Sequence, residues 1–202
     1  RLYLHGTFNR PSGCYWEYDS EGSQLLCILV EKLSGKSLLD YLKDKVFNKM
    51  GTFKNAYALK TPTGFTWGDS AFIGTLRDQA SFGHLLANEG NYNGEQLVNR
   101  DYVKKATSNV VNNTDAFFYG HHRYGYGYQI WHLKGNDFMT TGMGDQLTLV
   151  FKDKGIVFAI HSSNQGNPRS RDIIIEEAYK VVNSMTNESL EENKKADFVP
   201  GT

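Results

Sequence analysis

Two short stretches of the sequence hold residue types that could support hydrolytic chemistry. The first is Tyr18-Asp19-Ser20, which sets a phenol and a hydroxyl just ahead of a segment with helical periodicity. The second runs from Thr140 to Gln146 and is rich in glycine between two strand-like segments. Phenols can move protons, and the backbone N–H groups of a tight turn can stabilise an oxyanion. Taken singly, each stretch also fits ordinary helix packing or an ordinary turn.

Other common chemistries have no signature in the chain. The six histidines lack zinc-ligand spacing, and neither His-Glu-x-x-His nor Cys-x-x-Cys occurs. The glycines of Gly125-Tyr126-Gly127 lie in an aromatic run with no helix directly after it, which argues against a dinucleotide site. A Gly-x-Ser-x-Gly nucleophile elbow is also missing from the sequence. We therefore expect no cofactor and no metal.

Helices, then strands, then a final helix must position these two stretches. Helical spacing of apolar residues, with Ser20, Ser37 and Thr75 as N-caps, predicts the first three helices. The expected helices cover about 20–33, 38–47, 76–89, 99–107 and 170–186. Four short strands are expected at 126–133, 137–141, 146–152 and 155–162, with a hairpin turn between the last two. This order predicts an α+β fold with helices packed on an antiparallel sheet.

Length and composition narrow the class of protein. The chain has 202 residues, with 22 basic and 22 acidic side chains and no formal net charge, which argues against a nucleic-acid or membrane-surface role. No apolar run approaches the roughly 20 residues of a membrane span. Aromatic residues make up 13%, more than a disordered chain carries. The two cysteines are expected to be reduced, with Cys27 in the core.

Several motifs in a fixed order resemble one hydrolase superfamily over most of the chain, from Pro11 to about Lys180. We identify a resemblance to the serine hydrolases of the β-lactamase and penicillin-binding-protein superfamily, within the branch of class C β-lactamase-like carboxylesterases and 6-aminohexanoate-dimer hydrolases. The segments that carry it are Pro11-Ser12-Gly13, Tyr18-Asp19-Ser20, Leu25-Leu26, the stretch from Glu31 to Leu38, Phe47 to Gly51, Gly74 to Gly83, and Tyr124 to Tyr128. The resemblance implies a β-lactamase/DD-peptidase-like (transpeptidase-like) fold.

The resemblance also implies roles for individual residues. Tyr18 and Ser20 would form the second family motif, in which the phenol relays protons. Thr140, Thr141 and Gly142 would form the third motif, a substrate-binding strand, and the N–H of Met143 would join the oxyanion hole. A lysine beside the tyrosine lowers the pKa of the phenol in such sites and makes it a usable acid–base.

The first family motif, Ser-x-x-Lys, is missing, because no serine in the chain has lysine three positions on. In the family this motif precedes the tyrosine motif. We therefore expect residues 1–187 to be the C-terminal portion of one catalytic domain, followed by a tail at 188–202, with the missing N-terminal segment as their partner. Such a fragment is expected to be inactive alone. Relatives are mostly exported, so the resemblance favours the cell envelope or secretion.

Two departures from the family pattern bear on the substrate. Thr140 replaces a Lys or His that pairs with a substrate carboxylate, and Asp145 occupies a position usually held by glycine. The first change removes a charge-assisted hydrogen bond worth roughly 1.5–3 kcal/mol, and the second is expected to add negative charge near the site. Both favour neutral or cationic esters, amides or peptide-like substrates. Lys134 or Arg123 remain possible substitute cations.

Two further interpretations stay open at this stage. The chain could belong to a penicillin-binding-like domain that has lost catalysis and binds peptidoglycan or peptide ligands. It could also be a structural domain without a site, which the motifs favour least. The Thr140 and Asp145 departures leave room for the binding module, whereas Tyr18, Ser20 and Gly142 favour the enzyme.

Overall fold

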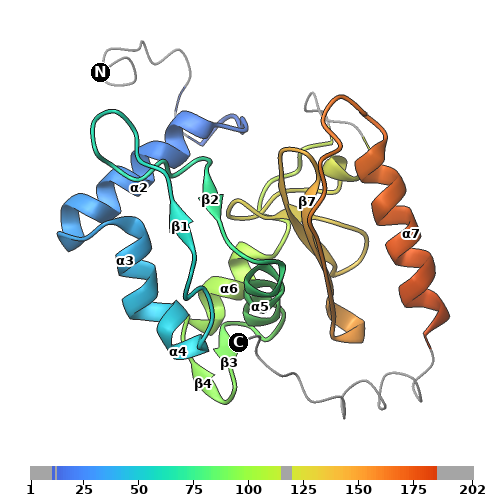
Figure 1. Cartoon of the computed structure of the whole chain (residues 1–202). Helices are drawn as coiled ribbons and strands as arrows, with labels where there is room; N and C mark the ends of the chain where they lie inside the picture. The colour runs from blue at the N-terminus through green and yellow to red at the C-terminus, as the bar shows by residue number, and fades with distance from the viewer. Residues whose placement is uncertain (1–10, 12, 115–119, 186–202) are drawn as a thin grey trace. The chain divides into compact units, whose positions relative to one another are not determined.

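The computed structural model describes residues 11, 13–114 and 120–185, and it divides into two compact units, Arg1–Thr75 and Leu76–Thr202 (Figure 1). Each unit is described by itself. The mixture of helices and antiparallel sheet confirms the predicted α+β class. No helix in the described residues combines the length and the apolar character that crossing a membrane requires.

The first unit consists of helices followed by a small hairpin. Its elements are α2 (Ser20–Ser34), α3 (Leu38–Leu42), the π-helical turn η1 (Lys43–Phe47), α4 (Asn48–Met50), and the antiparallel pair β1 (Tyr57–Ala58) and β2 (Phe72–Ile73). Gly35 ends α2 with a φ of 69°, a conformation that favours glycine. The Ser37 hydroxyl accepts a hydrogen bond from the Asp40 N–H at 3.1 Å, which confirms the predicted cap of α3.

Helix α2 differs from its prediction in two ways. Its N-cap is Asp19, with extended backbone, and Ser20 is the first helical residue. Its leucines lie exposed, including Leu26 at 58% and Leu33 at 79% exposure. The helical period was therefore predicted correctly, but several leucines on the apolar face it defines remain largely exposed.

Two clusters hold the first unit together. Glu31, on α2, accepts hydrogen bonds from the Leu38 N–H at 2.8 Å and from the Thr66 hydroxyl at 2.5 Å. Phe47 stacks on Phe53, with ring centroids 3.9 Å apart, and Phe72 packs against both rings. A carboxylate therefore fastens α2 to the start of α3 and to the loop before β2, while aromatic packing fixes the segment after η1.

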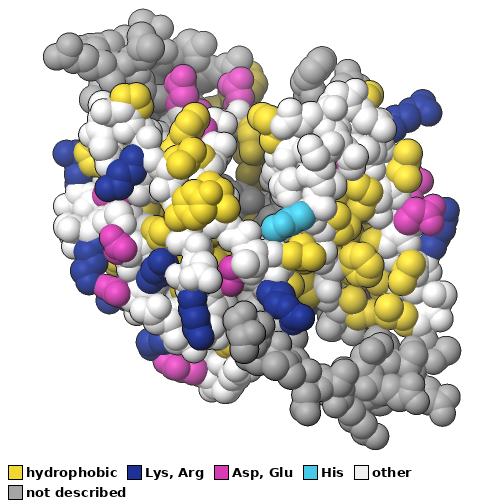
Figure 2. Space-filling view, in the orientation of Figure 1, with side chains coloured by type: hydrophobic (Ala, Val, Ile, Leu, Met, Phe, Trp, Pro, Cys, Tyr) yellow, Lys and Arg dark blue, Asp and Glu magenta, His cyan; other side chains and the backbone are white. Residues whose placement is uncertain are grey.

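The second unit is built around a four-stranded sheet. Its elements are α5 (Leu76–Ala87), β3 (Asn91–Tyr92), β4 (Glu95–Gln96), α6 (Arg100–Ala106), the 3₁₀ turn η2 (Gly120–Arg123), β5 (Trp131–His132), β6 (Phe138–Gly142), β7 (Gln146–Phe151), the 3₁₀ turn η3 (Lys152–Lys154), β8 (Ile156–Ile160) and α7 (Ser170–Ser184). The strands lie in the order β5-β6-β7-β8, and every neighbouring pair is antiparallel. Hydrophobic side chains also reach the surface in this unit, as in the first (Figure 2), and Ile173 of α7 is 52% exposed.

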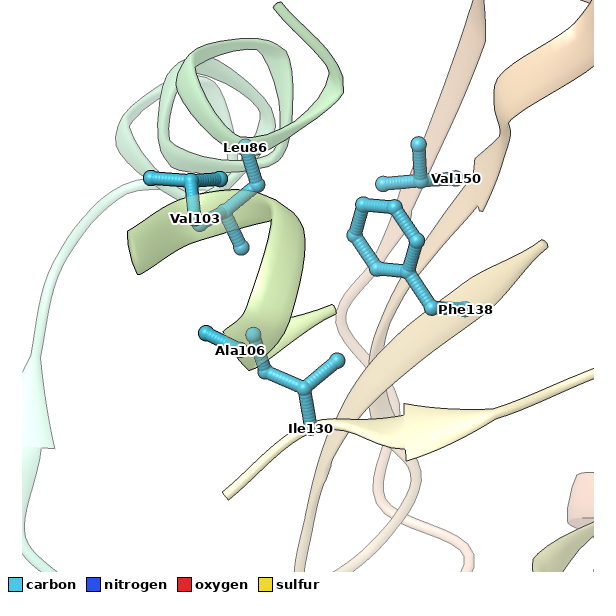
Figure 3. Packing of buried hydrophobic residues seen from close by; sticks show 6 residues of the cluster. All are labelled: Leu86, Val103, Ala106, Ile130, Phe138 and Val150. Atoms are coloured by element: carbon cyan, nitrogen blue, oxygen red, sulfur yellow. The ribbon is translucent and has the colours of Figure 1, made fainter. Parts of the chain in front are cut away.

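The core of the second unit lies between the sheet and helices α5 and α6. Figure 3 shows Phe138 and Val150 extending from the sheet toward Leu86 of α5. The cluster is completed by Val103, Ala106 and Ile130. On the other face of the sheet, the ring of Phe151 meets Tyr179 of α7 edge-on at 5.0 Å. Strand β6 is thus held between two helical layers, which fixes the position of the turn that follows it.

The first predicted strand, 126–133, is shorter than expected because the chain folds back within it. Gln129 has a φ of 59°, the Gly127 N–H donates to the Ile130 carbonyl at 2.8 Å, and Tyr126 bridges Trp131. Only the last part therefore forms β5. The strands β6, β7 and β8 and the helix α7 lie within about two residues of the predicted bounds.

Candidate active site

The second half of strand β6 presents an open backbone edge. β5 pairs with β6 only at Phe138 and Met139, whereas β7 pairs with β6 along its whole length to Gly142. On the side away from β7, Thr140 to Gly142 therefore meet no strand in the described part of the chain. The buried Thr141 hydroxyl also finds no hydrogen-bond partner there. An open strand edge beside an unused hydroxyl can bind an extended, polar substrate.

A tight turn follows this edge and carries free donors. The Asp145 N–H donates to the Gly142 carbonyl at 3.2 Å, and Gly144 has a φ of 77°, which is typical of a type II turn with glycine at its third position. The Met143 side chain is 79% exposed. Within the described residues, the N–H groups of Met143 and Gly144 donate no hydrogen bond. The turn can therefore offer backbone donors to a negative oxygen.

Asp145 does not supply the free negative charge that the sequence led us to expect. Its side chain is only 7% exposed, and its carboxylate accepts a hydrogen bond from Arg171 Nε at 3.0 Å and another from the Ser170 hydroxyl. This ion pair neutralises the charge within the fold. The expected electrostatic effect of Asp145 on anionic substrates is therefore wrong. Only the Thr140 substitution still supports a preference for neutral or cationic substrates.

Tyr18 and Ser20 belong to the first unit, where they lie at the start of α2. Tyr18 is 51% exposed, and Asp19 between them is the N-cap of the helix. The Ser23 N–H donates to the Asp19 carbonyl at 3.3 Å, so the helix begins directly behind the motif. The start of a regular element thus fixes the backbone of the tyrosine motif, while the phenol remains accessible.

The residues that hold the turn after β6 were not found by sequence reasoning. Arg171, Ser162 and Ser170 come from segments 16 to 29 residues further along the chain. Arg123, considered above as a substitute cation, instead donates to the Thr114 carbonyl from Nε at 3.0 Å and from Nη2 at 2.7 Å. Arg171 lies in the first turn of α7, where the helix dipole disfavours a positive charge. This unfavourable position is the one signal in the sequence that Arg171 has an acidic partner.

Comparison with known protein families agrees with the order of these motifs. The model of the beta-lactamase family matches residues 1–182. The chain belongs to the beta-lactamase family. A search of curated proteins found no match. Family membership is thus shown over nearly the whole chain and supports a hydrolase-like fold.

Solved structures of beta-lactamase-like proteins share the fold. One is a protein from Bacillus anthracis provisionally assigned as a 6-aminohexanoate-dimer hydrolase, with a TM-score of 0.68 and 20% identity, covering 95% of this chain and 48% of its own. Another, from Bacteroides dorei DSM 17855 and provisionally assigned as a beta-lactamase, has a TM-score of 0.72 and 14% identity, covering 90% of this chain and 62% of its own. The chain therefore spans about half to three fifths of the length of these neighbours.

Proposed function

We propose that this chain forms part of a serine hydrolase that cleaves esters or amides through an acyl-serine. The observation that carries the proposal is the turn after β6, where Met143 offers a free N–H beside the open edge of Thr140 to Gly142. Donors held in place by the fold stabilise a tetrahedral oxyanion without reorganising during the reaction. Tyr18 is proposed to relay protons, with Ser20 as the second polar member of its motif.

The nucleophile is proposed to lie outside these 202 residues. No serine within them has lysine three positions on, and the structural neighbours extend well beyond the region that this chain matches. A serine hydroxyl attacks poorly until a base takes its proton, so the proposed mechanism needs such a pair. A Ser-x-x-Lys segment from the remainder of the same domain would be the partner of this chain.

The substrate is proposed to be neutral or positively charged close to the scissile bond. Threonine at position 140 gives no cation for a substrate carboxylate, and the Asp145 charge is cancelled by Arg171. Neutral esters and short amides, including the amide type named for the Bacillus anthracis neighbour, are the first substrates to assay. Fast second-order acylation by benzylpenicillin would contradict this preference.

Covalent labelling of the full-length gene product tests the proposal. We expect a fluorophosphonate probe to add one equivalent at a serine outside the 202 residues, seen by intact-mass and peptide mass spectrometry. Tyr18→Phe should slow labelling by about 10²-fold or more, because general acid–base groups contribute roughly 10²–10⁴. Tyr15→Phe, which alters a neighbouring exposed phenol, is the matched control and should label at the parental rate.

Three outcomes would each contradict one part of the proposal. Labelling at a serine within residues 1–202 would overturn the assignment of the nucleophile. Equal rates for Tyr18→Phe and Tyr15→Phe would remove the role proposed for Tyr18. Complete absence of labelling and of ester turnover would favour the non-catalytic module that binds peptidoglycan or peptide ligands. The presence of threonine rather than a cation at position 140 also favours that module.

A further inference from the structure

In the turn after β6, two carbonyl groups are bonded within the fold, and the N–H groups of Met143 and Gly144 donate no hydrogen bond within the described residues. The Gly144 carbonyl accepts from the Ser162 hydroxyl at 2.6 Å and from the Asn164 N–H at 3.2 Å. The Gly142 carbonyl accepts from the Asp145 N–H and from Arg171 Nη2 at 3.4 Å. The carbonyls of Gly142 and Gly144 are thus bonded within the fold, while the N–H groups of Met143 and Gly144 are left available as donors.

Asp145 ends this turn with a backbone conformation that is unfavourable for most residues with a side chain. Its φ of 66° lies in the left-handed region, which residues other than glycine, asparagine and aspartate rarely adopt. The carboxylate compensates through its bonds to Arg171 and Ser170, and charge-assisted hydrogen bonds are about twice as strong as neutral ones. The side chain thus stabilises a backbone geometry that its own Cβ disfavours.

Arg171 connects the turn to two other elements of the second unit. It belongs to the first turn of α7, and its Nη1 lies 3.0 Å from Nε2 of His122 in η2. Because a guanidinium can only donate, His122 must accept at Nε2 and carry its proton on Nδ1. The His122 ring is held edge-on against Trp131 at 4.4 Å. One guanidinium thereby contacts a carboxylate and a carbonyl of the turn and an imidazole of η2.

We propose that the Asp145–Arg171 ion pair is a positioning device that holds the Gly142–Asp145 turn so that the Met143 N–H points toward the oxyanion. Its catalytic meaning rests on the hydrolase function proposed above. Asp145 and Arg171 touch neither substrate nor reacting atoms in this assignment. They act through the backbone of the turn, which the ion pair joins to the first turn of α7.

The test uses the full-length gene product and two independent readouts. Amide hydrogen exchange at Asp145, whose N–H closes the turn, reports the geometry of the turn whether or not the protein is a hydrolase. Steady-state hydrolysis of p-nitrophenyl butyrate reports catalysis. We expect Arg171→Met to lower the protection of the Asp145 amide at least tenfold, and to lower kcat by 10- to 100-fold with KM changed less than threefold.

Matched variants separate positioning from general destabilisation. Lys180→Met breaks an exposed ion pair with Glu177 on the same helix and should change neither readout. Asp145→Asn/Arg171→Met removes both charges, so it keeps the test usable if Arg171→Met does not fold, and it should show the same loss of protection and of kcat. Arg171→Lys keeps the charge and should recover part of the kcat lost in Arg171→Met.

Each outcome bears on the proposal. Parental protection of the Asp145 amide in a folded Arg171→Met or double variant would overturn it, as would a change confined to KM. If the unmodified full-length protein neither hydrolyses esters nor takes a fluorophosphonate label, the hydrolase proposal fails, and the exchange measurement still decides whether the ion pair holds the turn.

Discussion

At the scale of single residues, Glu31 joins three segments of the first unit through one carboxylate. Partial burial alone would raise the pKa of Glu31, but hydrogen bonds from Thr66 and Leu38 outweigh it and hold the pKa below its ordinary value of 4.5. A carboxyl whose pKa is lowered on folding stabilises the fold above its ordinary pKa, and that stabilisation is lost as pH falls through the folded-state pKa.

We therefore expect Glu31→Gln to lower the free energy of unfolding by about 1–2 kcal/mol at pH 7, since hydrogen bonds to charged groups are worth about that and the side chain is only half-buried. Urea unfolding followed by circular dichroism measures the loss. The difference should shrink between pH 5 and pH 3. Glu21→Gln, an exposed carboxylate of the same helix, is the control. A difference independent of pH would contradict this account.

The two cysteines should differ sharply in reactivity. Burial, with a smaller contribution from the charge of Glu31, raises the pKa of Cys27 to about 11, and its thiol donates to the Thr66 carbonyl at 3.5 Å. Cys14 is exposed. At pH 8 only about a thousandth of Cys27 is thiolate, and the thiolate is the reactive form.

A chromogenic aryl disulfide should therefore modify one thiol per folded chain quickly and the second only on addition of denaturant. Cys14→Ser should abolish the fast phase, while Cys27→Ser should leave it intact. Two thiols reacting at the same rate in the folded protein would show that Cys27 is not protected.

At the scale of elements, helix α5 approaches the sheet through Gly83. A Cβ added at Gly83 would lie 2.5 Å from Thr148 Cγ2 and 2.7 Å from Val157 Cγ1, closer than packed atoms tolerate. The helix could restore normal contacts only by moving off β7 and β8. Close packing of this kind makes the absence of a side chain a requirement of the fold.

Gly83→Ala should accordingly destabilise the protein by about 1–3 kcal/mol, measured by urea unfolding, although alanine favours an isolated helix by about 1 kcal/mol over glycine. Gly22→Ala in α2 provides the contrast, because its added Cβ would meet only the flexible Asp19 side chain. That variant should be neutral or slightly stabilising. A gain in stability for both would mean that α5 can shift without cost.

Sequence patterns predicted elements well where one local rule decided them. The Ser37 cap and the left-handed Gly35 follow from capping rules, and strands β6 to β8 follow from short apolar runs bounded by turn residues. The fold-back at Gln129 was missed because its left-handed residue is a glutamine, which is not typical of turns. The Asp145–Arg171 pair was missed because it joins residues 26 positions apart, and local spacing carries no information about such a contact. The roles of Tyr18, Ser20, Thr140, Thr141 and Gly142 remain predictions.

At the scale of the whole molecule, the chain spans 48% of one structural neighbour and 62% of another. The proposal made above places the activated serine outside this chain. The 202-residue chain produced alone should therefore show no fluorophosphonate adduct by intact mass and no turnover of p-nitrophenyl butyrate above a heat-denatured sample. Stoichiometric labelling of the isolated chain would place the nucleophile within it and refute the proposed division of the site.

The two members of the ion pair behind the Met143 turn differ in how far each depends on the other. A lone Asp145, 7% exposed, would bury an uncompensated charge, whereas a lone Arg171, 27% exposed, could remain hydrated and still bond the Gly142 carbonyl. Loss of Arg171 should therefore be tolerated less well than loss of Asp145. Arg171→Met should unfold at a lower urea concentration than Asp145→Gly.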